Sequence, residues 1–527
     1  MSESAIPTQM QWKFKELRKI LKETVKMTPS TGQSTMLPGN RIIVDLPYNS
    51  LCDWSTFCMS YTGQTNHGGG VVTGPAEYTR TRFFPRNTAS IIQNLELKIN
   101  GVSRFNVPDY NFVYNILYDY SQGGDALKRR QTGGENADPS NKHYIVGNDI
   151  IERRGYSIAP LNAIAGGGVP AVLVGNDDLA RDRQRYQIRS WIGPLGGNCS
   201  TNIIDSNLLG IVSVEITLAP SSCLMLGIPT VAGGITIANN TAARNEVGRG
   251  VIAADIVALG AGLSVAPENI NYSLDNVEFS IVRYHMPAEW YIAESSVLSS
   301  GHIYKLFYPN YSVITGNPVP SVNKAGVNRF SISTKSLDYV IGTFRLPTYD
   351  TPDLPLISKA SSQSSLEVGL SVATAENQIA AGCKRVFNQS RYFAHNGDSI
   401  TQCRWKCGFT EFPPQTLDEQ FNSLLQHFNC HQDTVSGMYP GINSLGAFRE
   451  CFYSHILSLN IPGENEMYTV SGIDTNETPC VIEWRVESSP YTPSDITPAG
   501  LNCTPYLIAS YNSHLEIKAG RVISTIS

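Results

Sequence analysis

Hydrophobic and polar residues alternate along much of this chain, and a period of two is typical of half-buried β-strands. In IVSVEITL at 211–218 the apolar residues share one face: Val212, Val214, Ile216 and Leu218. The same alternation recurs at 277–281, 457–461, 481–487 and 514–524. Glycine, proline and asparagine turns separate these runs. We therefore predict an all-β chain of short strands, which favours sandwiches or barrels.

Two short helices interrupt the strands. The pattern at 109–120 predicts one, with an apolar face of Phe112, Val113, Ile116, Leu117 and Tyr120. A second is predicted at 417–428, behind the capping box Thr416-x-x-Glu419. Each follows a strand-like run by a short proline-containing link.

The two helices belong to a pattern that occurs twice. LELKINGVSRFNVPDYNFVYNIL at 95–117 and TQCRWKCGFTEFPPQTLDEQFNSLL at 401–425 both read as strand, glycine, link and helix. When Gly101 is aligned with Gly408, however, the inward and outward positions of the two strands slip by one residue. We predict two copies of one β-domain at 39–290 and 301–527, joined by a linker at 291–300. Two long segments of the first copy, 121–180 and 227–270, are candidates for subunit contacts or outer decoration.

A basic amphipathic helix is predicted at 10–27, and with a linker it fills residues 1–38. One apolar stripe contains Met10, Phe14, Leu17, Leu21 and Val25. Such a helix can dock on a neighbouring protein, lie on an anionic membrane or pack on its own domain. Its expected contact residues are Trp12, Lys13, Phe14, Lys15, Leu17, Arg18, Lys19, Leu21, Lys22 and Val25.

The composition of the chain limits the classes of function that fit it. The chain has 527 residues, so we expect two or more domains. Charged residues make up 16%, which is low and suggests that partners cover much of the surface. A net charge of −5 excludes the chain as a whole from binding nucleic acid by charge alone. Residues 1–30 lack the apolar core of a secretory signal, and no apolar run reaches 18 residues. The 11 cysteines are therefore expected to be reduced.

Motifs for catalysis are missing from the sequence. It contains no GxxxxGK[ST], HExxH or GxSxG pattern, and GRGVIA at 248–253 lacks the strand–helix frame of a dinucleotide loop. The constellation Cys403, Cys407, His427, Cys430 and His431 has ligand types that suit zinc. In a strand, however, Cys403 and Cys407 lie roughly 13 Å apart, whereas zinc ligands lie within about 4 Å of each other. We expect core cysteines, and no cofactor, metal or catalytic residue.

Two further clusters have simple interpretations. His395-Asn396-Gly397-Asp398 pairs a His with an Asp, but Asn-Gly predicts a hairpin turn there. The arginine run at 181–189 leads into a strand and could face nucleic acid or an acidic partner. Its interleaved Asp182 favours a solvated or interface strand.

These features together resemble the double jelly-roll major capsid proteins of virophages and polinton-like viruses, in the adenovirus-like lineage of icosahedral viruses. The resemblance covers about 40–527. It rests on the order of these stretches: NLELKINGVSRFNVPDYNFVYNILYDY, NLLGIVSVEITLAP, SLDNVEFSIVRYHMP, SLDYVIGTFRLP and LEIKAGRVIS.

The resemblance implies two tandem jelly rolls, each with an inserted helix, standing side by side. Three chains would close into a pseudo-hexagonal capsomer that tiles an icosahedral shell, assembled inside the host cell. The implied partners are copies of the chain, vertex (penton), minor capsid or cement proteins, and an internal membrane surface, with no specific nucleic acid. The rivals are a secreted or surface carbohydrate-binding or adhesion protein, an enzyme on a β-sandwich, such as a glycosidase with paired carboxylates, and a minor or vertex capsid protein of the same virion.

Overall fold

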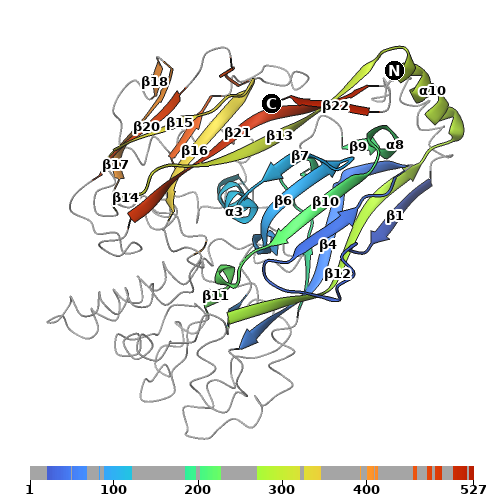
Figure 1. Ribbon diagram of the computed structural model, residues 1–527, viewed down its shortest axis with the longest axis horizontal. Helices are drawn as coiled ribbons and strands as arrows, with labels where there is room; N and C mark the ends of the chain where they lie inside the picture. The colour runs from blue at the N-terminus through green and yellow to red at the C-terminus, as the bar shows by residue number, and fades with distance from the viewer. Residues whose placement is uncertain are drawn as a thin grey trace, which may run out of the picture.

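The computed structural model describes the residues that build two groups of antiparallel sheets. Figure 1 shows the two groups, with the helix α3 (Tyr110–Ser121) lying where they meet. The described residues are 21–48, 50–67, 82–83, 88–121, 184–196, 202–226, 270–320, 326–345, 392, 400–408, 410–412, 455–459, 472–476, 481–488, 502–518 and 521–526.

The first group contains two main sheets, and each is built around four strands paired in sequence. One sheet runs in the order β1 (Leu21–Met27), β12 (Ile270–His285), β4 (Leu51–His67) and β8 (Gln184–Ile188). The strand β2 (Thr35–Met36) pairs with β12, and β9 (Ile203–Asp205) pairs with β4. The other sheet runs in the order β3 (Arg41–Asp45), β10 (Val212–Leu218), β6 (Ile92–Ile99) and β7 (Val102–Val107). Smaller elements complete the group: β5 (Arg82–Phe83), β11 (Met225–Leu226), η2 (Thr88–Ile91), η4 (Gly193–Leu195), η5 (Ser221–Cys223) and α8 (Ser206–Leu209).

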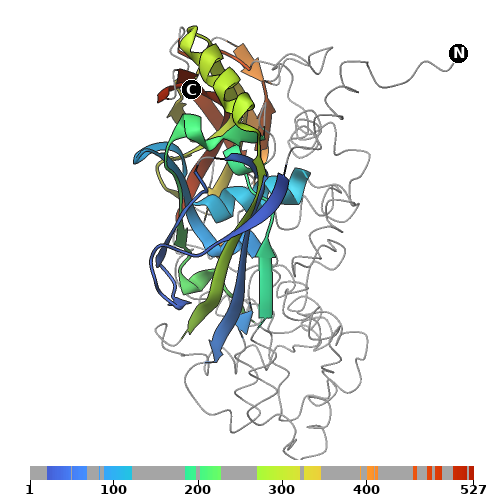
Figure 2. The same cartoon turned by 90° about the vertical axis from the view of Figure 1, so that its right-hand side faces the viewer.

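The second group repeats this arrangement. One sheet runs in the order β13 (Ile303–Thr315), β21 (Asn502–Lys518), β16 (Leu337–Arg345) and β19 (His455–Ser458), and β14 (Val319–Pro320) and β22 (Arg521–Ile526) pair with β21. The other runs in the order β15 (Gly326–Ser331), β20 (Val481–Ser488), β17 (Ile400–Cys407) and β18 (Thr410–Phe412). Along the chain, the helix α10 (Ala288–Ser299) connects the two groups and includes most of the linker predicted at 291–300. Figure 2 shows α10 at one end of the molecule.

The strand orders identify the fold. In chain order, eight strands of the first group (β1, β3, β4, β6, β7, β8, β10, β12) form two sheets in which the first strand pairs with the eighth and the second with the seventh. Eight strands of the second group follow the same order, with β13 matching β1 and β21 matching β12. Two four-stranded sheets connected in this way make a jelly roll. The chain is therefore mostly β and contains two tandem jelly rolls, as predicted.

The strand–glycine–helix pattern is explained by the register of two hairpins. Ile99 pairs with Val102, and Cys407 pairs with Thr410, so a two-residue turn closes each hairpin. The first turn residues are Asn100 with φ 51° and Gly408 with φ 61°. Asn100 therefore corresponds to Gly408, and the one-residue slip disappears. The predicted links also contain the strands β7 and β18, which pair with β6 and β17.

The helix α3 confirms the prediction at 109–120, with one difference in its burial. Phe112, Val113 and Ile116 are buried as expected, but so are Tyr110 and Tyr114 on the opposite side. Because α3 lies where the two jelly rolls meet, it has no solvent face in its first two turns. The second predicted helix, at 417–428, lies outside the described residues.

The predicted helix at 10–27 is wrong over its last seven residues. Leu21–Met27 form β1, which pairs with the edge of β12 from Leu21↔His285 to Met27↔Phe279. The same residues that fit a helical stripe also alternate with a period of two, since Glu23, Val25 and Met27 are half-buried and their neighbours are exposed. Backbone pairing with β12 outweighs the local helix propensity. Residues 10–20 lie outside the described part of the chain.

Candidate functional site: the junction of the two jelly rolls

The junction is formed at its centre by the start of α3. Asp109 precedes the helix with a φ of 51°, a left-handed conformation that costs a non-glycine residue energy. Its carbonyl oxygen accepts hydrogen bonds from Phe112 N at 2.9 Å and Val113 N at 3.1 Å, which start the helix. This turn directs the Asp109 carboxylate away from the first jelly roll and toward the second.

The partner of Asp109 is Arg345, at the end of β16 in the second jelly roll. Arg345 is fully buried, and its Nη1 lies 3.2 Å from Asp109 Oδ2. The guanidinium also donates to the Tyr392 carbonyl at 3.2 Å and to Tyr506 Oη at 3.3 Å. Tyr506 donates its hydroxyl proton to Asp109. A buried charge is tolerated only when it is paired and hydrogen-bonded, and here both conditions are met.

Aromatic rings enclose the same guanidinium. Its carbon lies 4.4 Å from the ring centre of Phe112, 4.8 Å from that of Tyr392 and 5.4 Å from that of Tyr506. Phe112 and Tyr506 meet edge to face at 5.4 Å. Burial raises the pKa of Tyr392 to about 12, although Arg345 acts against the shift. One cation therefore connects α3 of the first jelly roll with three segments of the second.

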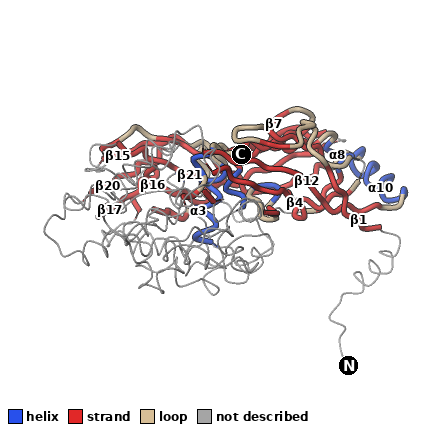
Figure 3. The backbone as a smooth tube through the Cα atoms, turned by 90° about the horizontal axis from the view of Figure 1, so that it is seen from below, coloured by secondary structure: helices blue, strands red, loops and turns tan. Residues whose placement is uncertain are grey.

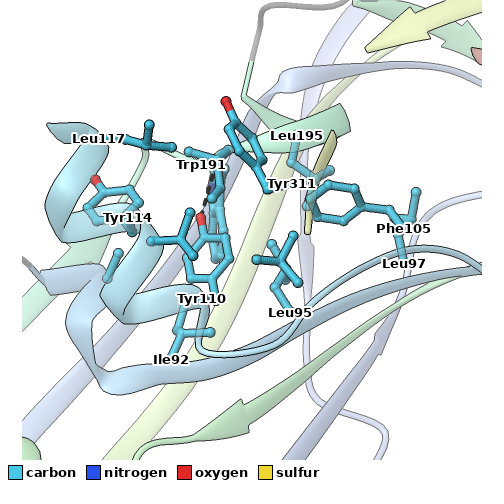
Figure 4. Close-up of a cluster of buried hydrophobic side chains, with 14 of the residues drawn as sticks. Ile92, Leu95, Leu97, Phe105, Tyr110, Tyr114, Leu117, Trp191, Leu195 and Tyr311 are labelled. Atoms are coloured by element: carbon cyan, nitrogen blue, oxygen red, sulfur yellow. Dashed lines mark hydrogen bonds between the residues drawn. The ribbon is translucent and has the colours of Figure 1, made fainter. Parts of the chain in front are cut away.

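A second contact between the two jelly rolls is made by aromatic side chains of β13. Tyr308 of β13 donates its hydroxyl proton to the Arg104 carbonyl in β7 at 3.0 Å and meets the Phe105 ring edge to face. Figure 4 shows Tyr311 of β13 beside Leu195 and Phe105 of the first jelly roll. Gly193 of η4 has a φ of 77°, and a Cβ there would lie 2.1 Å from the Phe105 ring. Buried side chains of both jelly rolls form one continuous core, so the junction behaves like the interior of a domain.

A second contact with charged groups joins the linker helix α10 to the first jelly roll. Glu294 of this helix faces Asp205, which ends β9 and caps α8 by accepting a hydrogen bond from Asn207 N at 2.9 Å. Burial, and then the neighbouring Asp205 carboxyl, raises the pKa of Glu294 to about 8. Glu294 therefore keeps its proton at neutral pH. The α3 contact and the α10 contact thus differ in charge.

The described residues offer structural bonds rather than reactive groups. Within them, no set of three or more His, Cys, Asp or Glu side chains is placed to hold a metal ion. Burial raises the pKa of Cys52, Cys58 and Cys223, which lowers their reactivity as nucleophiles. None of the described helices is long and apolar enough to cross a bilayer.

The residues singled out in the sequence are placed only in part. Of the ten N-terminal contact residues, Leu21, Lys22 and Val25 lie in β1, and Leu21 is largely exposed. The other seven lie outside the described residues: Trp12, Lys13, Phe14, Lys15, Leu17, Arg18 and Lys19. Cys403 and Cys407 lie in the strand β17 as predicted, whereas His427, Cys430, His431 and residues 395–398 are outside.

Of the arginine run, the described residues include Arg185, which lies in β8, and Arg189, which directly follows it. The junction itself was not predicted. Its signal was present in SLDYVIGTFRLP, where Arg345 closes an apolar strand that is buried at nearly every position.

Comparisons with known proteins agree on the fold. The chain is similar to PBCV-1 VP54, a crystal structure fitted into a reconstruction of the virophage Sputnik, with 11% identity, a TM-score of 0.50 and 95% of each chain covered. A quasi-atomic model of the PBCV-1 virus capsid matches with the same values. The Sputnik virophage structure matches with 10% identity and a TM-score of 0.46, over 96% of this chain and 88% of that one. No family model and no curated protein sequence matches the chain.

Proposed function

We propose that this chain is a major capsid protein whose trimers form pseudo-hexameric capsomers of an icosahedral virion. The observation that carries the proposal is the fixed pair of jelly rolls. The two-jelly-roll arrangement of PBCV-1 VP54 is matched over 95% of both chains, so the likeness extends to the pairing and not to one sandwich alone. A capsomer needs neighbouring sandwiches at a constant angle, and the Arg345 cluster holds them so.

The proposed trimer follows from closed symmetry. Three copies of a two-sandwich chain give six sandwiches, and a ring of such units tiles a flat facet. The 16% charged residues fit a chain whose surface is largely covered by its neighbours. Further partners in this proposal are adjacent capsomers and vertex, minor capsid or cement proteins.

The chain is divided at α10 in this proposal, with the second jelly roll at 301–527 and the first before the linker at 291–300. The first was predicted to occupy 39–290, and β1 extends it to Leu21. A second inserted helix at 417–428 would correspond to α3.

The N-terminal segment keeps a contact role in the proposal. β1 begins beside His285, three residues before α10, so the N-terminal end of β1 lies at the end of the first jelly roll that carries α10. Exposed apolar side chains gather at that end, including Leu21, Ile203 and Ile292. These and the basic residues from Lys13 to Lys22 would contact a neighbouring virion protein or an internal membrane.

The test is the solution mass of the purified chain by light scattering, with negative-stain images of the same peak. A mass near three times 57.7 kDa and a hexagonal outline support the capsomer. A monomer at every salt and protein concentration tried contradicts it.

A further inference from the structure

The sheet that packs on the junction has a counterpart in the first jelly roll. In β16, Gly342 pairs with Leu507 on one side and His455 on the other. In β4, Gly63 pairs with Leu274 and with Gln184 in the same way. The sheet β13-β21-β16-β19 can therefore be superimposed strand by strand on the sheet β1-β12-β4-β8.

The outer face of one of these sheets is buried, and the outer face of the other is exposed to solvent. The outer face of the second sheet is covered by the first jelly roll: Arg345 is fully buried, Tyr311 is 7% exposed and Ser510 is 2% exposed. On the first sheet, the side chains of Lys26 and Arg185 are 79% and 60% exposed. Figure 3 shows β1, β12 and β4 on the side of the first jelly roll away from the second. One sheet face is thus occupied within the chain, and its counterpart is open.

The open face is hollowed into a groove of about 620 Å³. A bulge in β4 makes the hollow, because the four residues from Trp54 to Phe57 lie opposite the single residue Ile281 of β12. Hydrogen bonds hold the bulge: Val282 N donates to Thr56 Oγ1 at 2.9 Å, and Trp191 Nε1 donates to the Phe57 carbonyl at 2.8 Å. The groove is therefore fixed in shape before anything binds.

The lining of the groove is polar and basic. Its small side chains are Ser55, Thr56, Cys58, Ser60 and Ser280. Among the described lining residues, the cations are Lys26, Arg185 and Arg189, and the one carboxylate is Glu278. Glu278 lies 3.2 Å from Arg185 and 3.9 Å from Lys26, so a positive excess is left for a ligand. A groove of this kind suits a carboxylate-bearing protein surface.

We propose that this groove is the docking site for the second jelly roll of a neighbouring copy of the chain. Within the chain, β7 of the first jelly roll packs against the outer face of the sheet β13-β21-β16-β19 in the second jelly roll. Its counterpart in the second jelly roll is the edge formed by β18, which carries the half-exposed carboxylate Glu411, 4.0 Å from Arg485. Repetition of the internal contact three times closes a ring of six jelly rolls. The inference rests on the proposed capsomer and assigns its subunit interface.

The test compares two arginines in similar ion pairs. Arg185 pairs with Glu278 at 3.2 Å, and Arg329 pairs with Glu483 at 3.0 Å on β15, the edge strand farthest from β18. We expect Arg185→Glu to raise the trimer dissociation constant at least tenfold in light scattering across a dilution series. Arg329→Glu should leave it within twofold of the unchanged protein. Circular dichroism and thermal midpoints show whether both variants are folded.

A second measurement needs no substitution. Cys58 lies on the groove floor and is half-buried in the single chain. Maleimide labelling, read by peptide mass, should be at least tenfold slower at Cys58 in the trimer than after dilution to the monomer. The buried Cys223 serves as the control and should stay unlabelled in both. Equal labelling of Cys58, or an unchanged trimer with Arg185→Glu, overturns the groove and leaves the capsomer standing. A monomeric wild-type chain overturns both.

Discussion

The contact of α3 with the second jelly roll and the contact of α10 with the first jelly roll are built on opposite electrostatic principles. At the α3 contact, the Arg345 guanidinium is compensated by the Asp109 carboxylate and by three rings. At the α10 contact, Glu294 faces another carboxyl, Asp205, and only a proton on Glu294 relieves the repulsion. The first contact should therefore hold over a wide pH range, whereas the second should weaken as the solution becomes alkaline.

The largest expected effect comes from removing the buried cation. Arg345→Met leaves the Asp109 carboxylate at the junction without its counter-charge, so the free energy of unfolding should fall by about 3–5 kcal/mol. Denaturant titration measures the change. Arg329→Met removes an arginine from an exposed pair and should cost less than about 1 kcal/mol. A loss at Arg345 no larger than at Arg329 would show that the cluster does not hold the junction.

A smaller loss is expected from crowding the same junction. Gly193→Ala places a Cβ against the Phe105 ring in a left-handed conformation, and overpacking of this kind costs about 1–3 kcal/mol. Gly39 has the same φ of 77° with no atom within 4 Å of its Cβ position. Gly39→Ala therefore reports the backbone cost alone. Equal thermal shifts for the two variants would mean that Phe105 moves aside freely.

The α10 contact is tested by its dependence on pH. Because the pKa of Glu294 is raised in the folded chain to about 8, its proton stabilises the fold at low pH, and this stability is lost as pH rises from about 4.5 through 8. The effect should be on the order of 1 kcal/mol after solvent screening of this half-exposed group. Glu294→Gln should flatten the fall in unfolding free energy between about pH 4.5 and 8.

Glu289→Gln on the exposed side of the same helix is the control and should keep the fall of the wild type. Burial raises the pKa of Asp338 in the second jelly roll to about 7. Asp338 therefore adds the same pH dependence of stability to the wild type and to both variants. If Glu294→Gln and the wild type lose stability in parallel, the carboxyl pair is not the cause.

The smallest effect concerns the edge strand β1, which is shorter than its counterpart β13. Hydrogen bonds from His285, and then from Arg283, lower the pKa of Glu23. This contribution is present above about pH 4.5 and is lost as pH falls through the lowered pKa. Amide exchange in β1, corrected for its intrinsic rate, should therefore speed up between pH 6 and pH 3. Glu23→Gln should remove that pH dependence, and exchange in β13 should not change.

The sequence predicted the elements that local pattern determines. The strand at 211–218, the helix α3 and the repeat were visible because alternation and helical spacing are properties of neighbouring residues. β1 was missed since LKETVKM fits both periods, and only the edge of β12, more than 250 residues away, decides between them. The Arg345 cluster was missed for the same reason. Its members come from 109–112, 345, 392 and 506, and no local spacing links them.

The burial of the first two turns of α3 has a consequence for synthesis of the chain. Tyr506, the hydrogen-bond partner of Asp109, is synthesised 397 residues after it. At roughly 5–20 residues per second, translation of that length takes roughly 20 to 80 seconds. During that time the first jelly roll can fold, but Phe112 and its neighbours stay uncovered on the nascent chain. A chaperone or a neighbouring nascent chain can reach this surface before the second jelly roll does. The yield of native protein should therefore depend on how soon the segment around Tyr506 emerges from the ribosome.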